Sequence, residues 1–219
     1  MRIPITKYGQ PQVTIWTAGL AALALVAGYY VHWGAGLAVA AVAVGVLAFF
    51  RDPARSVPDG PRLLVSPADG KVVEVRDVTE AEFLGGPAKM IAIFLSLFDV
   101  HVNRSPAAGL VAYERYVPGR FRAAFHSKAG SENERNIVGL EEVEGTDAKL
   151  LVVQISGVVA RRIVSRARPG VRLGRGEDFG MIKFGSRTEL YIPADRVAEI
   201  RVRPGDKVRA GRDVVGVLK

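Results

Sequence analysis

The sequence predicts a mainly β domain, built as a sandwich or barrel, behind an N-terminal transmembrane helical hairpin. Two observations support this. From Tyr8 to Phe50 the chain contains no Asp, Glu, Lys or Arg. A bilayer requires such an uncharged run, whereas the core helix of a soluble protein does not. After Pro61, short runs rich in β-branched and aromatic residues recur at even spacing between turn-forming groups, as in sandwiches and barrels.

Residues 1–50 form the predicted membrane anchor. A single helix over the uncharged region would be about twice as long as the hydrocarbon layer is thick, so the chain must fold back or lie partly in the interface. The break is expected at 32–34 (His-Trp-Gly), between the apolar segments 13–31 and 35–50. Small residues would let the two helices approach closely. They are Gly19, Ala21, Ala22, Gly36, Ala40 and Ala41.

The charges that flank the anchor predict its orientation. Arg2 and Lys7 precede it, Arg51, Arg55 and Arg62 follow it, and the link between the helices is uncharged, so both ends should be cytoplasmic. We therefore expect a cell-membrane protein with its main domain on the cytoplasmic side. A cleaved signal peptide would normally have a shorter apolar region and a polar sequence after it. The absence of cysteine agrees with a reducing compartment.

The formal net charge is +8, and basic residues are dense between 161 and 175. The arginines concerned are Arg161, Arg162, Arg166, Arg168, Arg172 and Arg175. Beside a membrane anchor, anionic lipid headgroups are a simpler partner for this cluster than nucleic acid. A solvated face without a ligand is an equally good interpretation for any single arginine.

Residues 51–61 carry three prolines and read as a linker, and 62–219 form the predicted catalytic domain. A short helix is expected at 79–83, and the polar segment 131–147 is expected to be a loop and a hairpin edge. The expected strands are Lys71–Val75, Met90–Phe98, Leu110–Tyr116, Leu150–Ile155, Val158–Val164, Thr188–Ile192, Val197–Val202 and Asp213–Leu218.

Two stretches, Ser66–Val75 and Val202–Val217, echo each other. Both have the Gly-turn-Lys-Val character of hairpins in biotinyl/lipoyl-type β domains, so the fold is expected to contain lipoyl-like hairpins. A membrane-tethered binding or carrier module, with Lys71 or Lys207 at a turn, is therefore one candidate function.

His101 and Asp99 are the first candidates for chemistry. They follow the apolar run 90–98, and the period of two places them on one face of an extended segment. An Asp beside a His can fix the tautomer and raise the basicity of the ring, although a purely structural Asp–His hydrogen bond is equally compatible. His126 has no carboxylate close in sequence, so a loop or packing role is favoured.

A serine hydrolase that uses Ser186, His101 and Asp69 is a further candidate. Ser186 lacks the G-x-S-x-G elbow before a helix, because the chain continues as a strand. Asp69 precedes a glycine and can be read as a turn residue. No metal site is expected, since neither His101 nor His126 has a second ligand at metal-binding spacing and the chain has no thiol.

Gly185 and Ser186 form a small step between two apolar, strand-like runs. The dipeptide carries little information, since it also occurs at Gly130 and Ser131. Ser131 opens a charged loop, where a new chain end would lie in water. A chain end made at Ser186 could be held by both neighbouring strands.

The ordered motifs SPADGKV, FDVHVNRSP, ENERN and FGS, followed by a short C-terminal strand region, resemble the phosphatidylserine decarboxylase family in its short, membrane-anchored form. The resemblance covers nearly all of residues 50–219. It implies a proenzyme that cuts itself between Gly185 and Ser186, giving a β chain of residues 1–185 and an α chain of residues 186–219. Ser186 would become a pyruvoyl group that forms a Schiff base with the substrate amine, and no external cofactor would be needed.

The resemblance also implies roles for three other residues. Asp69 and Asp99 would support the cleavage, and His101 would position the carboxylate or return the proton. Longer family members carry a second histidine three positions after the first, where this chain has Arg104.

The implied product is phosphatidylethanolamine, although an archaetidylserine-type substrate is equally compatible with these residues. The oligomeric state, a homo-oligomer included, and whether the anchor spans the bilayer stay open.

The local chemistry agrees with this resemblance. A glycine before the serine leaves its carbonyl uncrowded, so that the serine hydroxyl can attack it and convert the peptide into an ester. Decarboxylation of an amino acid needs an electron sink, which a pyruvoyl carbonyl and its amide would supply.

Overall fold

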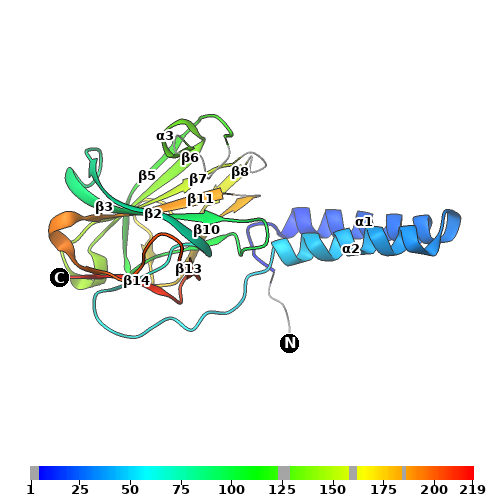
Figure 1. Cartoon of the computed structure of the whole chain (residues 1–219), viewed down its shortest axis with the longest axis horizontal. Helices are drawn as coiled ribbons and strands as arrows, with labels where there is room; N and C mark the ends of the chain where they lie inside the picture. The colour runs from blue at the N-terminus through cyan, green and yellow to red at the C-terminus, as the bar shows by residue number, and fades with distance from the viewer. Residues whose placement is uncertain (1–4, 123–128, 158–161, 184–185) are drawn as a thin grey trace. The chain divides into compact units, whose positions relative to one another are not determined.

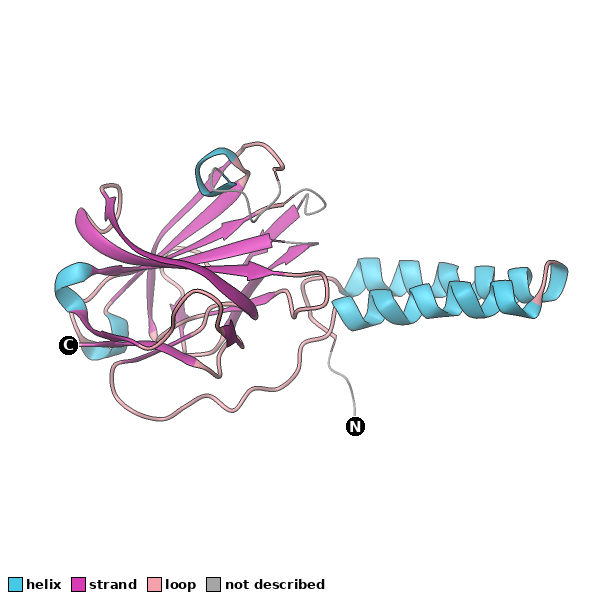
Figure 2. Cartoon of the chain, viewed as in Figure 1, coloured by secondary structure: helices cyan, strands magenta, loops and turns pink. Residues whose placement is uncertain are grey.

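The computed structural model describes residues 5–122, 129–157, 162–183 and 186–219. The chain forms two compact units that divide between Ala54 and Arg55, within the predicted linker. The first unit is helical and the second is almost entirely β (Figure 2).

The helical unit is an antiparallel pair, α1 (Gln10–Tyr30) and α2 (Trp33–Phe49) (Figure 1). The break falls at Val31 and His32, and the Nδ1 atom of His32 caps α2 by accepting a hydrogen bond from a main-chain N–H two residues later. Small residues do mediate the contact, because a side chain at Gly36 would come within 3.0 Å of the main chain of Gly28. The predicted helical hairpin is therefore confirmed.

One helix in the described part of the chain is long and apolar enough to cross a membrane. Its apolar window, Val13–Tyr30, has a mean hydropathy of 1.5 and is 6% buried. The second helix is apolar but shorter. Large side chains such as Trp16, Leu25 and Tyr29 are exposed on this unit, as expected of helices that meet lipid rather than water.

The β unit contains an eight-stranded sheet and two three-stranded sheets. The eight-stranded sheet has the order β13-β2-β3-β11-β7-β6-β5-β9, is antiparallel throughout and curls around the core (Figure 1). The two small sheets have the orders β4-β10-β8 and β1-β14-β12. The strands are β1 (Leu63–Val65), β2 (Gly70–Glu80), β3 (Gly86–Leu95), β4 (Val102–Arg104), β5 (Gly109–Val117), β6 (Arg135–Glu141), β7 (Leu150–Ile155), β8 (Arg162–Ser165), β9 (Arg172–Leu173), β10 (Asp178–Lys183), β11 (Ser186–Pro193), β12 (Val197–Ile200), β13 (Lys207–Val208) and β14 (Val214–Leu218).

Between the strands lie three short helical turns: α3 (Ala129–Glu132), η1 (Val143–Gly145) and η2 (Ala194–Arg196). The main core lies on one face of the large sheet, where β3, β7 and β11 contribute alternate aliphatic residues. Burying this apolar surface is the main favourable contribution to folding of the unit. The predicted mainly β fold is confirmed.

The two echoing stretches pair with each other. Lys207 of β13 lies opposite Lys71 of β2, and Val72 exchanges main-chain hydrogen bonds with Gly205 and Asp206. The last strand, β14, pairs instead with β1 and β12. Both lysines therefore lie within strands, away from the exposed turn that a carrier module would need.

Three local expectations were wrong. Thr79 and Glu80 end β2 and are followed by a turn, so the helix expected at 79–83 does not form. Strand β6 lies inside the sheet between β5 and β7, and its residues 136–140 are buried there. The segment 131–147 is therefore not a hairpin edge. Strand β3 ends at Leu95 rather than Phe98. Of the strand expected at 158–164, residues 158–161 lie outside the described residues.

The second half of the predicted linker lies on the β unit. Arg175 donates hydrogen bonds to the carbonyl oxygens of Pro58 (2.9 Å) and Gly60 (2.8 Å), and Val57 packs beside Gly176. Residues 55–61 are therefore held in place rather than acting as a free spacer.

Candidate active site

Ser186 is the first residue of β11, and its neighbours place it against the core. It pairs with Leu95 at the end of β3, and both side chains share the core face of the large sheet. Ser186 is fully buried, and its Oγ atom has no hydrogen-bond partner among the described residues. A buried hydroxyl without a partner costs free energy, so its presence at a strand end indicates a function. Gly185, the other half of the predicted cleavage site, lies outside the described residues.

Next to Ser186 a chain of buried amides joins two sheets. The side-chain amide of Asn103 on β4 donates to Thr188 Oγ1 on β11 (2.9 Å) and accepts from Gln154 Nε2 on β7 (2.9 Å). Gln154 Oε1 in turn accepts from Asn136 on β6 (3.2 Å), and Asn103 also donates to the carbonyl of Pro67 (3.3 Å). Three of the recognised motifs, through Pro67, Asn103 and Asn136, thus meet in hydrogen bonds beside Ser186. We call the connected side chains the amide network (Asn103, Asn136, Gln154, Thr188).

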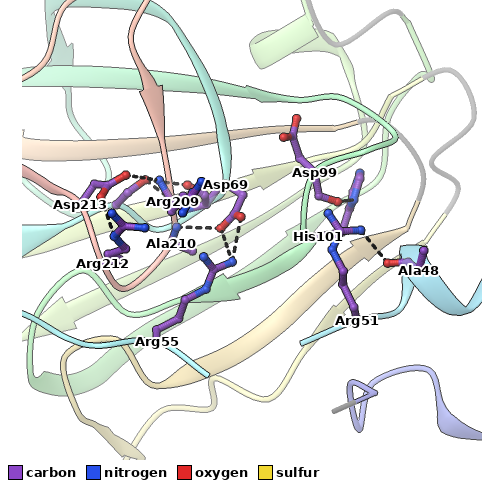
Figure 3. Close-up of polar contacts among 12 residues, drawn as sticks. Ala48, Arg51, Arg55, Asp69, Asp99, His101, Arg209, Ala210, Arg212 and Asp213 are labelled. Carbon is purple, nitrogen blue, oxygen red and sulfur yellow. Dashed lines mark hydrogen bonds and ion pairs between the residues drawn. The ribbon is translucent and has the colours of Figure 1, made fainter. Parts of the chain in front are cut away.

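His101 immediately precedes β4 and is fully buried. Its carbonyl accepts a hydrogen bond from the N–H of Ile182 (3.2 Å), which holds it beside β10, the strand that leads to Ser186. Its Nδ1 atom lies 2.9 Å from the carbonyl oxygen of Asp99 (Figure 3). Since a carbonyl can only accept, Nδ1 carries the proton in this contact.

Asp99 contacts His101 differently from what the sequence suggests. Because β3 ends at Leu95, residues 97–99 form a turn and the period of two does not apply. The carboxylate of Asp99 accepts hydrogen bonds from Ser96 through the main-chain N–H (2.8 Å) and Oγ (2.6 Å), which closes this turn. The contact that fixes the imidazole thus comes from the carbonyl of Asp99 rather than from its carboxylate.

Asp69 directly precedes β2 and is more than a turn residue. Both carboxylate oxygens accept from Arg55 Nη2 (2.9 and 2.8 Å), and Oδ1 also accepts from the N–H of Ala210 (2.8 Å) (Figure 3). The side chains of Arg55 and Asp69 are 8% and 11% exposed. Burial raises the pKa of Asp69 above its ordinary value, while Arg55 and the Ala210 N–H oppose that rise. The next residue, Gly70, lies so close to Phe94 that a side chain would clash with its carbonyl oxygen.

The two carboxylates line one cavity of about 620 Å³. It opens at the ends of β2, β3 and β13, and four basic residues line its wall beside Asp69 and Asp99. Its described lining residues are Asp69, Gly70, Lys71, Phe94, Ser96, Asp99, Lys207, Val208, Arg209, Arg212 and Asp213. The structure therefore brings Asp69 and Asp99 together at one cavity. Ser186 pairs with Leu95, which lies between the lining residues Phe94 and Ser96, and His101 contacts the carbonyl of the lining residue Asp99.

Two further positions bear on the predicted site. Arg104, where longer relatives would have a second histidine, donates a hydrogen bond to the carbonyl of Gly176 (2.9 Å), which ties β4 to a neighbouring turn. Lys183 ends β10 and is buried, and burial, followed by the nearby charge of Arg162, lowers its pKa. Sequence reasoning missed Lys183, although a lysine within the apolar run MIKF was a signal. His126 lies outside the described residues.

The alternative functions find little support. A serine hydrolase needs a Ser–His hydrogen bond and a His–Asp hydrogen bond, but the Oγ of Ser186 has no described partner and Asp69 is bound by Arg55. Within the described residues no group of three His, Cys, Asp or Glu side chains could hold a metal ion.

Three arginines of the basic cluster are neutralised by glutamates. Arg168 pairs with Glu114 (2.6 Å), Arg172 with Glu142, and Arg175 with Glu144 (2.7 Å). These three arginines therefore offer little charge to a lipid headgroup. Arg161 lies outside the described residues.

Comparison with known proteins gives consistent results. The model of the family "phosphatidylserine decarboxylase" matches residues 43–216. A phosphatidylserine decarboxylase proenzyme of Symbiobacterium thermophilum is 50% identical over 219 residues, covering 100% of this chain and 98% of that protein. A protein of the same name from Carboxydothermus hydrogenoformans is 42% identical over the full length of both chains, and one from Rhodopirellula baltica is 44% identical over 97% of this chain and 87% of that protein.

Proposed function

This chain belongs to the phosphatidylserine decarboxylase family, and from that membership we propose that it is a self-processing proenzyme. After cleavage between Gly185 and Ser186 it decarboxylates phosphatidylserine to phosphatidylethanolamine. The observation that carries the proposal is the buried Oγ of Ser186, which has no described hydrogen-bond partner at the start of a central strand.

The cleavage uses the chain's own atoms. Ser186 Oγ attacks the carbonyl carbon of Gly185, and the peptide nitrogen leaves that carbon, so that the amide becomes an ester. Removal of the α-proton of Ser186 then forms a Cα=Cβ double bond, breaks the Cβ–Oγ bond and releases Gly185 as a carboxylate. The remaining dehydroalanine takes up water and loses ammonia, which leaves a pyruvoyl group at the new chain end. Asp69 and Asp99, on the adjoining cavity, are the carboxylates proposed to support these proton transfers.

The sheet explains how the two chains stay together. Strand β11 pairs with β3 over its whole length and with β7 from Arg187 to Tyr191. The α chain, residues 186–219, would therefore keep a central strand of the large sheet, while β14 pairs with β1 of the β chain. Cutting before Ser186 removes one covalent bond and leaves these contacts in place.

The residues around Ser186 fit a pyruvoyl group. The Ser186 Oγ has no hydrogen-bond partner among the described residues that would compete with its reaction, and the side chains of the amide network beside it carry no charge. A pyruvoyl carbonyl would supply the electron sink that decarboxylation needs. Strand pairing would hold this group at the start of β11, and the hydrogen bond from Asn103 to Thr188 would fix the strand two residues later.

His101 is proposed to handle the proton in decarboxylation. The Nδ1–H group is engaged by the Asp99 carbonyl, so Nε2 is the nitrogen that can accept a proton and return it to the substrate α-carbon. Its burial keeps bulk water away from that exchange.

The helical unit is proposed to be the membrane anchor, residues 1–50, with the catalytic domain, residues 62–219, on the cytoplasmic side. The apolar helix Val13–Tyr30 and the basic residues on both flanks support this arrangement. A phospholipid substrate would then be available in the same membrane.

A denaturing gel tests the proposal, with the purified full chain as the sample. The wild-type protein should give two fragments that correspond to residues 1–185 and 186–219, and it should form phosphatidylethanolamine from phosphatidylserine. Ser186→Ala should remain a single inactive chain. Ser131→Ala, which alters the other Gly-Ser step, should be cut normally. Efficient cutting at the same bond in Ser186→Ala would refute the mechanism.

A further inference from the structure

The turn between Ser96 and Asp99 exposes two large apolar side chains. Leu97 is 49% exposed and Phe98 is 88% exposed, the highest value for a large apolar side chain in the described part of the protein. Exposing apolar side chains of this size to water is unfavourable relative to burying them. Their neighbours Ser96 and Asp99 line the cavity of the candidate site, so the exposed pair lies directly beside it.

Three cations around the same cavity have no counter-ion among the described residues. The side chains of Lys71, Lys207 and Arg209 make no ion pair or hydrogen bond within the part of the chain that the structure describes. Arginines elsewhere on the domain, such as Arg168 and Arg175, are paired with glutamates. The cavity wall therefore carries positive charge that no described carboxylate pairs with.

Both features lie at one end of the large sheet. Lys207 lies opposite Lys71, Lys71 lies opposite Phe94, and the chain enters the apolar turn two residues after Phe94. Val171, whose carbonyl is bound by the N–H of Val111, lies at the other end of the sheet.

We propose that this end of the catalytic domain docks on an anionic phospholipid bilayer. Leu97 and Phe98 enter the interface, and Lys71, Lys207 and Arg209 bind lipid phosphates and carboxylates. An exposed apolar tip flanked by unpaired cations is the pattern by which proteins bind membrane surfaces. A soluble anion would account for the cations but not for the exposed phenyl ring. We call this surface the lipid-facing surface (Leu97, Phe98, Lys71, Lys207, Arg209).

The docking explains how a lipid could reach a buried serine. This step rests on the proposed function, because it takes phosphatidylserine as the substrate. With Phe98 among the acyl chains, Asp99 lies at headgroup depth and the cavity opens toward the lipid. A lipid headgroup would then need to rise out of the bilayer surface only as far as the cavity is deep.

A site-specific fluorescent label tests the docking directly. The chain has no cysteine, so Phe98→Cys gives the full-length protein a single labelling site for an environment-sensitive dye. After reconstitution into vesicles of phosphatidylserine and phosphatidylcholine, emission should shift to the blue and be quenched by nitroxide-labelled lipids. A label at Val171→Cys, at the opposite end of the sheet, should show neither change. Equal responses at the two positions would overturn the proposal, and so would a label at position 98 that is already buried in lipid-free protein, because a protein contact would then cover the turn.

An activity test separates docking from chemistry. Leu97→Ser/Phe98→Ser should still cleave itself, and its turnover of long-chain phosphatidylserine in vesicles should fall about tenfold or more relative to short-chain phosphatidylserine in solution. Each substitution of Lys71, Lys207 or Arg209 by Ala should raise the KM for vesicles about fivefold, and Lys219→Ala should not.

Equal losses on both substrates would contradict the docking. Failure of the wild-type chain to cleave itself would contradict the proposed function, while the label at position 98 would still decide whether the turn meets lipid.

Discussion

The two faces of β11 carry opposite kinds of polar residue. On the core face, Ser186 and Thr188 lie beside the amide network, whose own side chains are uncharged and which meets a carboxylate only where Asn136 donates to Glu114 (3.4 Å). On the other face, Arg187 is buried between two carboxylates, donating to Glu189 (2.7 Å) and Glu74 (3.0 Å). Strand β11 therefore carries uncharged polar side chains on its core face and a buried ionic cluster on the other face.

The comparison shows how a strand can be cut at its first residue and keep its place. A fixed charge beside Ser186 would perturb every proton transfer there, whereas neutral amides hold the strand without doing so. The ionic cluster does not touch Ser186, but its bond from Arg187 to Glu74 on β2 would join the α chain to the β chain. We therefore expect the ionic face to determine stability and the amide face to determine processing.

Arg187→Leu should have the largest effect on stability. It leaves Glu189 buried without its cation, so the free energy of unfolding should fall by about 3–5 kcal/mol. Thermal unfolding of the full chain in detergent would measure the loss. Arg201→Ala, which removes the exposed pair with Glu199, is the matched control and should cost less than about 1 kcal/mol. Similar losses in the two variants would mean that the buried cluster is not what holds the strand.

Arg55→Met extends the comparison to the buried Arg55–Asp69 ion pair at the cavity of the candidate site. Removing the cation should destabilise the fold by about 3 kcal/mol at neutral pH, because Asp69 is left charged and buried. Loss of Arg55 should also raise the pKa of Asp69 further, since Arg55 opposes the effect of burial. When the pKa of a carboxyl group is higher in the folded than in the unfolded state, its contribution to stability is fully present below the unfolded-state pKa, which is 3.8 for Asp. That contribution is lost as the pH rises through the folded-state pKa.

The stability gap between wild type and Arg55→Met should therefore narrow at acidic pH and widen toward pH 8. Denaturant titrations across that range would show it. A gap that is independent of pH would mean that Arg55 acts only through packing.

Asn103→Leu tests the amide face. It leaves Gln154 Nε2 without its acceptor and Thr188 Oγ1 without its donor, at about 1–3 kcal/mol for each buried group, so we expect a total of about 2 kcal/mol after partial relaxation. Unlike Arg187→Leu, this variant should also slow self-cleavage, which a time course of fragment formation would detect. Normal cleavage kinetics in a destabilised variant would show that the network is purely structural.

Tyr191→Phe should have the smallest effect. Tyr191 donates to Glu189 (2.6 Å), and burial, followed by this carboxylate, raises its pKa, so it stays a neutral donor. Losing this hydrogen bond should cost about 1.5 kcal/mol with no change in cleavage rate. Slower self-cleavage of Tyr191→Phe would contradict the expectation that the ionic face of β11 affects only stability.

The sequence predicted much of the fold because its strongest signals are local. The uncharged region predicted the helix pair, and alternating apolar runs predicted β5, β7, β11 and β14 to within two residues. Strand β6 was misassigned because its apolar core follows the polar and charged residues 132–135, and its place inside the sheet depends on pairing with β5 and β7. The short strands β4, β9 and β13 are too brief to show a period.

The site was predicted only in part. Motif order indicated Ser186, His101, Asp69 and Asp99, but their partners come from distant segments. Arg55 and Ala210 bind Asp69 from positions 14 residues before it and 141 residues after it, and no local pattern shows that. The carbonyl of Asp99, rather than its carboxylate, contacts His101 because a turn replaces the expected extended segment.

Mass spectrometry of the small fragment from the active, purified protein tests the central claim most directly. The account predicts a chain of residues 186–219 whose N-terminal group is lighter than serine by one ammonia, as a keto terminus requires. An active protein that contains an unmodified Ser186 within an uncut chain would contradict it.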